Sequence, residues 1–339
     1  MSISHERLQP LSFILLLLIA IAARWGGLSE GFWIDEVISA DTAAMGMGEL
    51  IARSGLADVH PPGYYVLLKA WTTLAGTSDM AARLLTLVIS VGSVALLVLY
   101  ASERYGRIPS LVAGLALALS PAYVHYGVEV RSYALLSFLT VGALWSQERL
   151  MSRASCPRRQ ALFVICLSAL SWIHNLGLLV SSALLLHALL SAPVSALGMV
   201  RALGTCVAAL FTPWLPLLLV QVFHQPEAMT AHLSTPISGV ELLAGLGPAA
   251  LSTTPLLPVV VGVLFWLSAA MAWSRSTAHL APETDVSPMG RWWIFSLVIA
   301  LIGPLLALTI LPLSPLTFDL IAGEIPLAYA LFAVSAAGI

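Results

Sequence analysis

Long apolar stretches alternate with short polar segments along most of the chain. A helix that crosses the hydrocarbon core of a bilayer needs about 20 mostly apolar residues. The chain offers about ten such stretches, at residues 9–25, 81–101, 109–127, 133–149, 160–174, 176–192, 202–222, 256–274, 292–312 and 326–339. Because lipid gives the backbone no hydrogen-bond partner, these stretches must be helical. The pattern predicts an all-α fold, a polytopic transmembrane helical bundle.

Composition excludes an ordinary soluble domain. Hydrophobic residues make up 59% of the 339 residues, charged residues make up 9%, and the mean hydropathy is +0.94. Soluble domains are about half apolar and about one quarter charged. The net charge of −2 is small, and no cluster of basic and aromatic residues is typical of nucleic-acid binding, so no nucleic-acid partner is expected. The three cysteines predict no disulfide framework.

The distribution of Lys and Arg predicts the orientation in the membrane. With a cytoplasmic N-terminus, ten of the 15 basic residues fall in the predicted inner loops, among them Arg158 and Arg159. This bias follows the positive-inside rule. The first apolar stretch lacks a small-residue cleavage site before Trp25, so we expect a retained helix. The prediction is an integral protein of the bacterial inner membrane.

A long polar segment at residues 26–80 lies on the predicted outer face. We expect one membrane domain over residues 1–339, with this first outer loop, core spans over 81–225 and a divergent C-terminal part over 226–339. Residues 37–53 are amphipathic and predict a helix along the interface. The adjacent acids Asp35 and Glu36 are a solvated turn or, where the dielectric is low at the end of a membrane helix, a site for a general base.

The same loop continues with His60, followed by Pro61 and Pro62. Two prolines at a helix start hold the preceding backbone extended, so His60 is presented at a defined place. The side chains of Tyr64, Tyr65 and Lys69 then follow. They fit a binding site, and they equally fit an aromatic belt with a snorkelling lysine.

A second polar cluster closes the third predicted span. It contains Glu129, Arg131 and Tyr133, and unpaired charges at such a boundary mark a ligand site or an ion pair that orders the loop. Arg83, at the outer start of the second span, is a flanking residue or a third arm of the same site. His174 and His187 have no second ligand at metal spacing, so we expect them to be hydrogen-bonded within the bundle.

These motifs, in this order, resemble the polytopic lipid-linked glycosyltransferases of the GT-C fold. The resemblance is to the family 39 branch, which includes protein O-mannosyltransferases and aminoarabinose transferases. It covers residues 10 to about 225 and includes His174. The motifs that carry it are Asp35-Glu36, His60-Pro61-Pro62-Gly63-Tyr64-Tyr65, Arg83, Ser120-Pro121, and Glu129, Arg131 and Tyr133.

The resemblance implies an inverting transferase that passes a sugar from a polyprenyl-phosphate carrier to a lipid, glycan or protein acceptor on the outer face. It implies Asp35 and Glu36 as catalytic residues, with Asp35 as the general base and Glu36 as its neighbour in the acceptor or metal environment. Lipid phosphate and sugar are expected to bind His60, Tyr64, Tyr65, Lys69, Arg83, Glu129, Arg131 and Tyr133. No metal ligands are predicted, no cofactor is certain, and dependence on a divalent metal stays open.

Two features favour an alternative. Family members carry an Arg-Tyr pair in a late outer loop, whereas residues 314–326 contain Asp319 there, and an acid near a lipid phosphate would repel it. The chain also ends soon after this loop. The alternative is a catalytically inactive member that packs against partner subunits in a membrane complex. A transporter ranks below both, because its ionisable residues would lie at mid-membrane.

Overall fold

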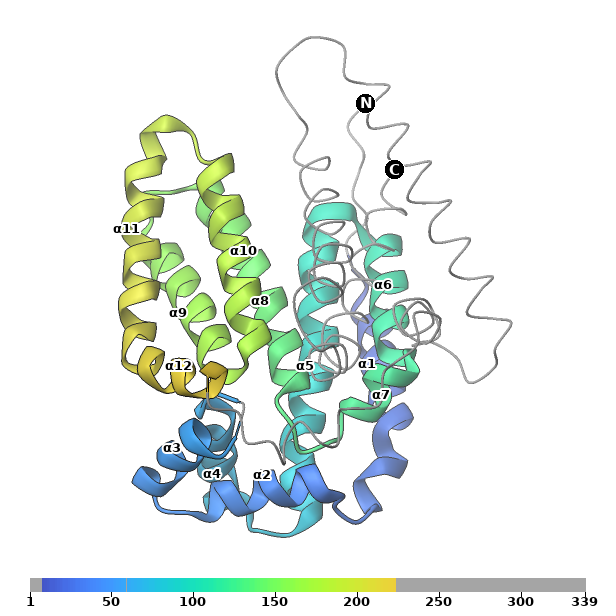
Figure 1. Cartoon of the computed structure of the whole chain (residues 1–339). Helices are drawn as coiled ribbons and strands as arrows, with labels where there is room; N and C mark the ends of the chain where they lie inside the picture. Colours follow the sequence, from blue (N-terminus) through green and yellow to red (C-terminus); the bar gives the residue numbers. More distant parts are fainter. Residues whose placement is uncertain (1–7, 59, 224–339) are drawn as a thin grey trace, which may run out of the picture. The chain divides into compact units, whose positions relative to one another are not determined.

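The computed structural model describes residues 8–58 and 60–223 (Figure 1), and every regular element in that part is a helix. The all-α prediction is therefore confirmed for these residues. The elements, in chain order, are α1 (Pro10–Arg24), η1 (Trp25–Ser29), α2 (Ile34–Ala44), α3 (Met47–Leu56), α4 (Gly63–Ala75), α5 (Asp79–Tyr105), α6 (Arg107–Leu119), α7 (Pro121–Tyr126), α8 (Tyr133–Ser152), α9 (Pro157–Ile173), α10 (Asn175–Ser191), α11 (Val194–Phe211), η2 (Thr212–Trp214) and α12 (Leu215–Phe223).

Each predicted span before residue 223 is helical in the structure, although the spans expected over 109–127 and 202–222 each cover more than one element. Three segments of the described part are long and apolar enough to cross a membrane by length and composition, at Pro10–Ser29, Asp79–Tyr105 and Val194–Gln221. Two shorter apolar helices lie at Arg107–Leu119 and Asn175–Leu189. The predicted spans at 256–274, 292–312 and 326–339 lie outside the described residues, as does Asp319.

A proline shortens one of the predicted spans. The helix expected over residues 109–127 ends at Leu119, where Ser120 has a ψ of 120° and Pro121 begins the short helix α7. A residue before proline is pushed out of the helical region, so the chain breaks there. Within the helix expected over 202–222, Pro213 lies in the short 3-10 turn η2, but Thr212 before it keeps helical dihedrals, so the segment from Val194 to Gln221 stays helical.

The described residues fall into two compact units. In the first, which contains residues 8–23 and Leu97–Tyr126, Gly114 on α6 lies directly against Leu16 of α1 and Val98 of α5. The guanidinium of Arg107 donates to Gln9 (3.0 Å) and to the Ser12 hydroxyl (3.2 Å). Glycine at position 114 lets these three helices approach closely.

The second unit contains Arg24–Leu96 and the described residues from Gly127 onward. Within it, α9 packs against α8, α10 and α11, which run beside it in Figure 1. Phe163, Leu167 and Leu170 of α9 are buried, at the spacing of one helical face. This bundle supports the short helices that follow α1, since α4 packs against α9 and α3 against α12.

The amphipathic loop helix is present, but it is divided into α2 and α3. The break comes at Met45, whose carbonyl oxygen and that of Ala43 accept hydrogen bonds from the Lys69 ammonium at 2.6 and 3.2 Å. A cation at a helix C-terminus satisfies carbonyls that have no partner within the helix. Lys69 of α4 therefore stabilises the end of α2.

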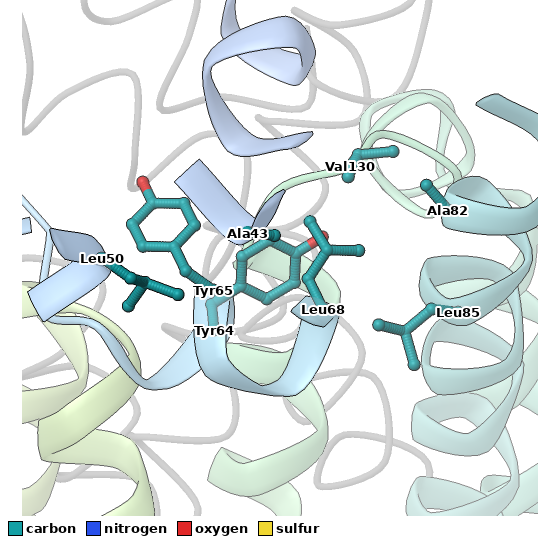
Figure 2. Packing of buried hydrophobic residues seen from close by; sticks show 8 residues of the cluster. All are labelled: Ala43, Leu50, Tyr64, Tyr65, Leu68, Ala82, Leu85 and Val130. Carbon is teal, nitrogen blue, oxygen red and sulfur yellow. The ribbon is translucent and has the colours of Figure 1, made fainter. Parts of the chain in front are cut away.

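The core under these helices is one hydrophobic cluster that joins α2, α3, α4, α5 and the loop before α8. Figure 2 shows its buried residues, which are Ala43, Leu50, Tyr64, Tyr65, Leu68, Ala82, Leu85 and Val130. The helix α4 begins at Gly63, directly after the two prolines, as the sequence predicts. A Cβ at Gly63 would lie 2.5 Å from the carbonyl oxygen of Trp172, so glycine allows α4 to reach the end of α9.

Candidate active site

Glu36 joins three separate segments of the chain. It is 0% exposed. Its carboxylate accepts hydrogen bonds from the backbone N–H of Trp33 (3.2 Å) and of Val130 (3.0 Å). It also accepts two from Arg83, at 3.1 Å from Nε and 2.5 Å from Nη2. All four bonds fall on one buried carboxylate, so Glu36 fixes the start of α2 against α5 and the loop before α8.

Arg83 also forms several hydrogen bonds that stabilise the fold. Besides its two bonds to Glu36, the guanidinium donates to the carbonyl oxygens of Gly27 and Gly31, the latter at 3.0 Å. It also lies 5.7 Å from the centre of the Phe32 ring. The sequence predicts Glu36 as a catalytic residue beside Asp35 and Arg83 as a contact to the lipid phosphate. In the structure, both side chains instead bond to each other and to backbone groups.

Asp35 has the opposite environment from its neighbour Glu36. It lies in the first turn of α2, its side chain is 32% exposed, and its Oδ2 is 3.9 Å from Nη2 of Arg131, whose side chain is 11% exposed. Arg131 also lies 5.9 Å from the centre of the Tyr133 ring. The structure thus brings together the predicted base, the predicted cation and Tyr133, although nearly 100 residues separate the first from the other two.

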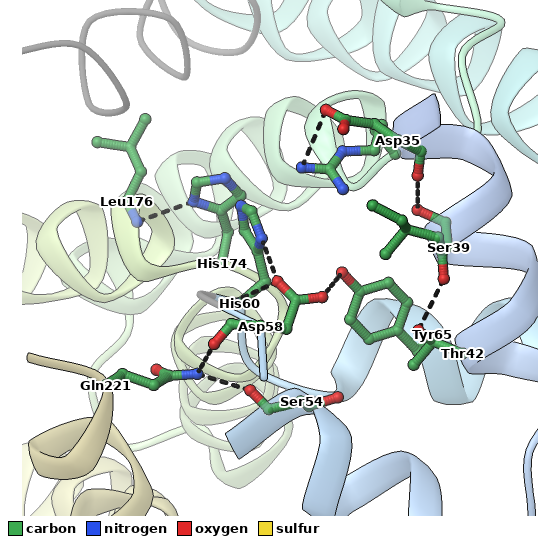
Figure 3. A network of polar contacts seen from close by, with 12 residues as sticks. Asp35, Ser39, Thr42, Ser54, Asp58, His60, Tyr65, His174, Leu176 and Gln221 are labelled. Atoms are coloured by element: carbon green, nitrogen blue, oxygen red, sulfur yellow. Dashed lines mark hydrogen bonds and ion pairs between the residues drawn. The ribbon is translucent and has the colours of Figure 1, made fainter. Parts of the chain in front are cut away.

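A buried carboxylate, Asp58, holds His60 and Tyr65 together (Figure 3). Its Oδ1 lies 3.1 Å from Nδ1 of His60 and accepts from the His60 backbone N–H at 3.2 Å, and its Oδ2 accepts from the Tyr65 hydroxyl at 2.6 Å. Burial raises the pKa of Asp58, but the bonds and charge of His60 and the Tyr65 hydroxyl outweigh it and hold the pKa well below its usual range. Asp58 is therefore a carboxylate that only accepts hydrogen bonds.

A narrow pocket lies among these groups. The space of about 180 Å³ between its lining atoms includes volume that is open to solvent. Predicted site residues His60, Tyr64, Tyr65 and Arg131 line it, together with Ser39, Ser132 and Ile173. Burial raises the pKa values of both tyrosines above the usual range, so both phenols stay protonated donors. Burial lowers the pKa of Arg131, but the phenols of Tyr65 and Tyr133 and the carboxylates of Asp35 and Asp58 raise it overall.

Glu129 is a buried acid of a different kind. The residue is 3% exposed, and within residues 8–58 and 60–223 neither carboxyl oxygen has a hydrogen bond of good geometry. Burial raises the pKa of Glu129 to about 7, with repulsion from Glu36 and Asp35 adding to it, while Arg131 and the nearby indole of Trp33 lower it. Glu129 therefore exchanges a proton near neutral pH.

His174 adjoins the pocket, between α9 and α10. Its Nδ1 accepts a hydrogen bond from the backbone N–H of Leu176 at 3.0 Å, and its ring lies 4.7 Å from the His60 ring and 6.0 Å from the Tyr133 ring, centre to centre. His187 lies 2.6 Å from the amide of Gln147. The prediction that both histidines are hydrogen-bonded within the bundle is confirmed.

Sequence reasoning missed Asp58 and Gln221 as members of this site. Asp58 had a signal, because it precedes His60 by two residues, the spacing of a side chain that can bond back to the following backbone. Gln221 had none, since it lies 163 residues from Asp58 in the chain. In the described part of the chain, no group of three or more His, Cys, Asp or Glu side chains is arranged to hold a metal ion.

Comparisons with known proteins match this architecture. Residues 59–217 match the family model described as dolichyl-phosphate-mannose-protein mannosyltransferase. The crystal structure of ArnT from Cupriavidus metallidurans bound to undecaprenyl phosphate superposes with a TM-score of 0.57 at 16% sequence identity. The match covers 96% of this chain and 59% of that one, so the chain spans about three fifths of the length of that protein. None of the curated proteins matches the chain.

Proposed function

Because this chain is an integral membrane protein with the GT-C fold of ArnT, we propose that it is a glycosyltransferase that takes its sugar from a polyprenyl-phosphate carrier. Three findings support the proposal. ArnT carries undecaprenyl phosphate in its crystal structure, the matching family model describes a transferase that uses a dolichyl-phosphate sugar, and the matched residues 59–217 contain most of the pocket residues. The acceptor is a lipid, glycan or protein on the outer face.

The proposed mechanism rests on the contact between Asp35 and Arg131. Transfer from a lipid phosphate requires a base that takes the proton of the acceptor and a cation that stabilises the phosphate as it leaves. Asp35 is partly exposed, and its carboxylate lies 3.9 Å from the guanidinium of Arg131, which lines the pocket. In the proposed reaction, Asp35 removes the acceptor proton, the acceptor oxygen or nitrogen bonds to the anomeric carbon, and the carbon–oxygen bond to the phosphate breaks.

We propose a single displacement with inversion at the anomeric carbon. Glu36 accepts four hydrogen bonds and is fully buried, so it is not available as a second carboxylate for a two-step reaction. We therefore assign Glu36, Arg83 and Lys69 to support of the site. His60, Tyr64, Tyr65, Arg131 and Tyr133 remain the proposed contacts to phosphate and sugar, and Glu129 remains a proposed sugar contact.

The pocket is too narrow to enclose the donor. Sites that enclose a whole drug-sized ligand have about 300 Å³ or more. The pocket lined by His60, Tyr64, Tyr65 and Arg131 is nearly filled by its own side chains, so we propose that these side chains contact the donor phosphate at the mouth of the pocket. The prenyl tail would then lie along apolar helix surfaces, in the hydrocarbon that surrounds them.

The base assignment is tested by the substitution Asp35→Asn in protein reconstituted in nanodiscs. Sugar transfer is followed as release of undecaprenyl phosphate from mannosylated undecaprenyl phosphate, with membrane lipids and proteins as acceptors. Loss of a general base costs about 100- to 10,000-fold in rate. The matched control is Asp41→Asn, an exposed acid on the same helix. Equal rates for the two variants would refute Asp35 as the base.

A second measurement separates the enzyme from the alternative of an inactive subunit. Wild-type protein that binds undecaprenyl phosphate and turns over a donor supports the enzyme. Protein that co-purifies with other membrane subunits in fixed stoichiometry and binds no undecaprenyl phosphate supports the subunit.

A further inference from the structure

We propose that Asp58, anchored by Gln221, is a positioning residue that holds the His60 ring so that its Nε2 serves the phosphate of the lipid-linked donor. The inference rests on the proposed function, because it takes a lipid phosphate as the ligand of the pocket. It assigns roles to two residues that never touch the donor.

The first step is the direction of the bond between Asp58 and His60. Asp58 accepts from the Tyr65 hydroxyl at 2.6 Å and from the His60 backbone N–H, both of which are donors. Its low pKa makes it a carboxylate, which has no proton to give. Since Asp58 Oδ1 lies 3.1 Å from His60 Nδ1, the proton of this bond belongs to Nδ1.

The second step is the nitrogen that remains. A ring that donates through Nδ1 presents Nε2 as an acceptor when neutral and as a second donor when protonated. His60 and Arg131 line the same pocket. A protonated ring would donate a charge-assisted hydrogen bond from Nε2 to an anionic phosphate at that pocket.

The third step is what holds Asp58 itself. The side-chain amide of Gln221, on α12, donates to the backbone carbonyl oxygens of Asp58 (3.0 Å) and Ser54 (2.7 Å), as Figure 3 shows. The same helix presses Leu217 against Gly55, where a Cβ would lie 2.8 Å from a Leu217 methyl carbon. Two carbonyls on one amide fix the turn after α3, and with it the carboxylate of Asp58.

The other face of the His60 ring is also confined. The rings of His174 and His60 meet edge to face with centres 4.7 Å apart. Because His174 accepts the Leu176 backbone N–H through Nδ1, the neutral His174 ring carries its proton on Nε2. The bond to Asp58 and the contact with His174 together leave the His60 ring little freedom to rotate.

The test determines directly which ring nitrogen of His60 carries a proton. The full chain is labelled with ¹⁵N-histidine, placed in nanodiscs at pH 8, and the His60 signals are assigned among those of the eight histidines by comparison with His60→Gln. We expect a proton on Nδ1 both with and without lipid phosphate, and a shift of the Nε2 signal after addition of undecaprenyl phosphate. A wild-type His60 with its proton on Nε2 alone overturns the proposal, whatever any variant does.

Variants then connect the geometry to binding. Asp58→Ala is expected to weaken undecaprenyl phosphate binding about 10- to 100-fold, the range found for carboxylates that orient a histidine. Asp58→Asn keeps an acceptor for the Nδ1 proton, so it retains part of the affinity. Asp41→Ala, on the exposed face of α2, leaves the affinity unchanged. Equal affinities for Asp58→Ala and the wild type overturn the positioning role and leave the proposed function intact.

Gln221→Met supplies a variant outside the pocket in case Asp58→Ala fails to fold. Its matched control is Gln160→Met, which also removes an amide bond to a backbone carbonyl, that of Ala154 at 2.7 Å. We expect Gln221→Met to weaken binding and disturb the His60 signals, and Gln160→Met to do neither. If wild-type protein binds no undecaprenyl phosphate while the Nδ1 proton persists and depends on Asp58, the proposed function fails and the Asp58–His60 geometry stands.

Discussion

Glu36 and Arg83 form a buried two-pronged ion pair, with Nε 3.1 Å from Oε1 and Nη2 2.5 Å from Oε2. Paired bonds of this kind are the strongest that arginine makes with a carboxylate. Glu36 also accepts a hydrogen bond from the backbone N–H of Val130, the residue before Arg131. Since Glu36 directly follows Asp35, this bond holds Arg131 close to Asp35. The second acid of the Asp35–Glu36 motif thus places the first acid beside its cation.

The Glu36→Gln substitution is expected to destabilise the protein by about 3–5 kcal/mol, the cost of leaving the partner of a buried ion pair uncompensated. The measurement is the unfolding of detergent-solubilised protein followed by tryptophan fluorescence. Asp35→Asn is the matched neighbour and is expected to change stability little, because Asp35 is partly exposed. A Glu36→Gln variant with wild-type stability and no activity would return Glu36 to a catalytic role.

The Arg131→Ala substitution is expected to weaken binding of undecaprenyl phosphate about 10- to 100-fold, because hydrogen bonds to a charged group contribute about 1.5–3 kcal/mol. Binding is measured in nanodiscs by native mass spectrometry. The control is Arg153→Ala, an exposed arginine at the end of α8. Arg131→Lys should recover only part of the affinity, since lysine cannot bind phosphate with two parallel bonds. Unchanged affinity in Arg131→Ala would exclude this arginine as the phosphate contact.

Glu129 predicts a stability that depends on pH. Its pKa is about 7 in the folded protein, against an ordinary value of 4.5. The folded state therefore holds the proton more tightly, so stability falls as pH rises from about 4.5 to about 7, by an amount on the order of 3 kcal/mol. Glu129→Gln removes this loss. We expect the variant to be more stable than the wild type at pH 8 and similar to it near pH 4.5.

The control for this experiment is Glu49→Gln, which removes an exposed acid from α3. Its stability relative to the wild type should be the same at both pH values. A Glu129→Gln variant that behaves in this way would show that Glu129 is not a buried acid with a raised pKa.

Gly63 predicts a steric limit at the start of α4. In Gly63→Ala the added methyl group would lie 2.5 Å from the Trp172 carbonyl oxygen, which is backbone and cannot rotate away. We expect a loss of about 1–3 kcal/mol, as for other overpacked sites. Gly48→Ala on α3 meets no atom within 4 Å and should stabilise slightly, because alanine favours a helix. Equal unfolding curves for the two variants would contradict the close approach of α4 and α9.

Local pattern was enough for the class of fold. Apolar length predicted helices wherever the structure describes a span, and Pro61 and Pro62 predicted where α4 begins. The same reasoning overextended one helix past Ser120, because hydrophobicity alone does not register that a proline follows. Hydrophobicity averages over many residues, whereas a helix ends at one.

The sequence by itself determined that the polar clusters Asp35-Glu36 and Glu129-Arg131 lie between apolar stretches, since charged side chains are costly to place in lipid. It did not distinguish Asp35 from Glu36, which are neighbours with the same chemistry. Tertiary structure decided that one faces Arg131 and the other faces Arg83, because adjacent residues of a helix point about 100° apart. It also brought Gln221 to Asp58, a contact between distant segments that no local pattern of residues can encode.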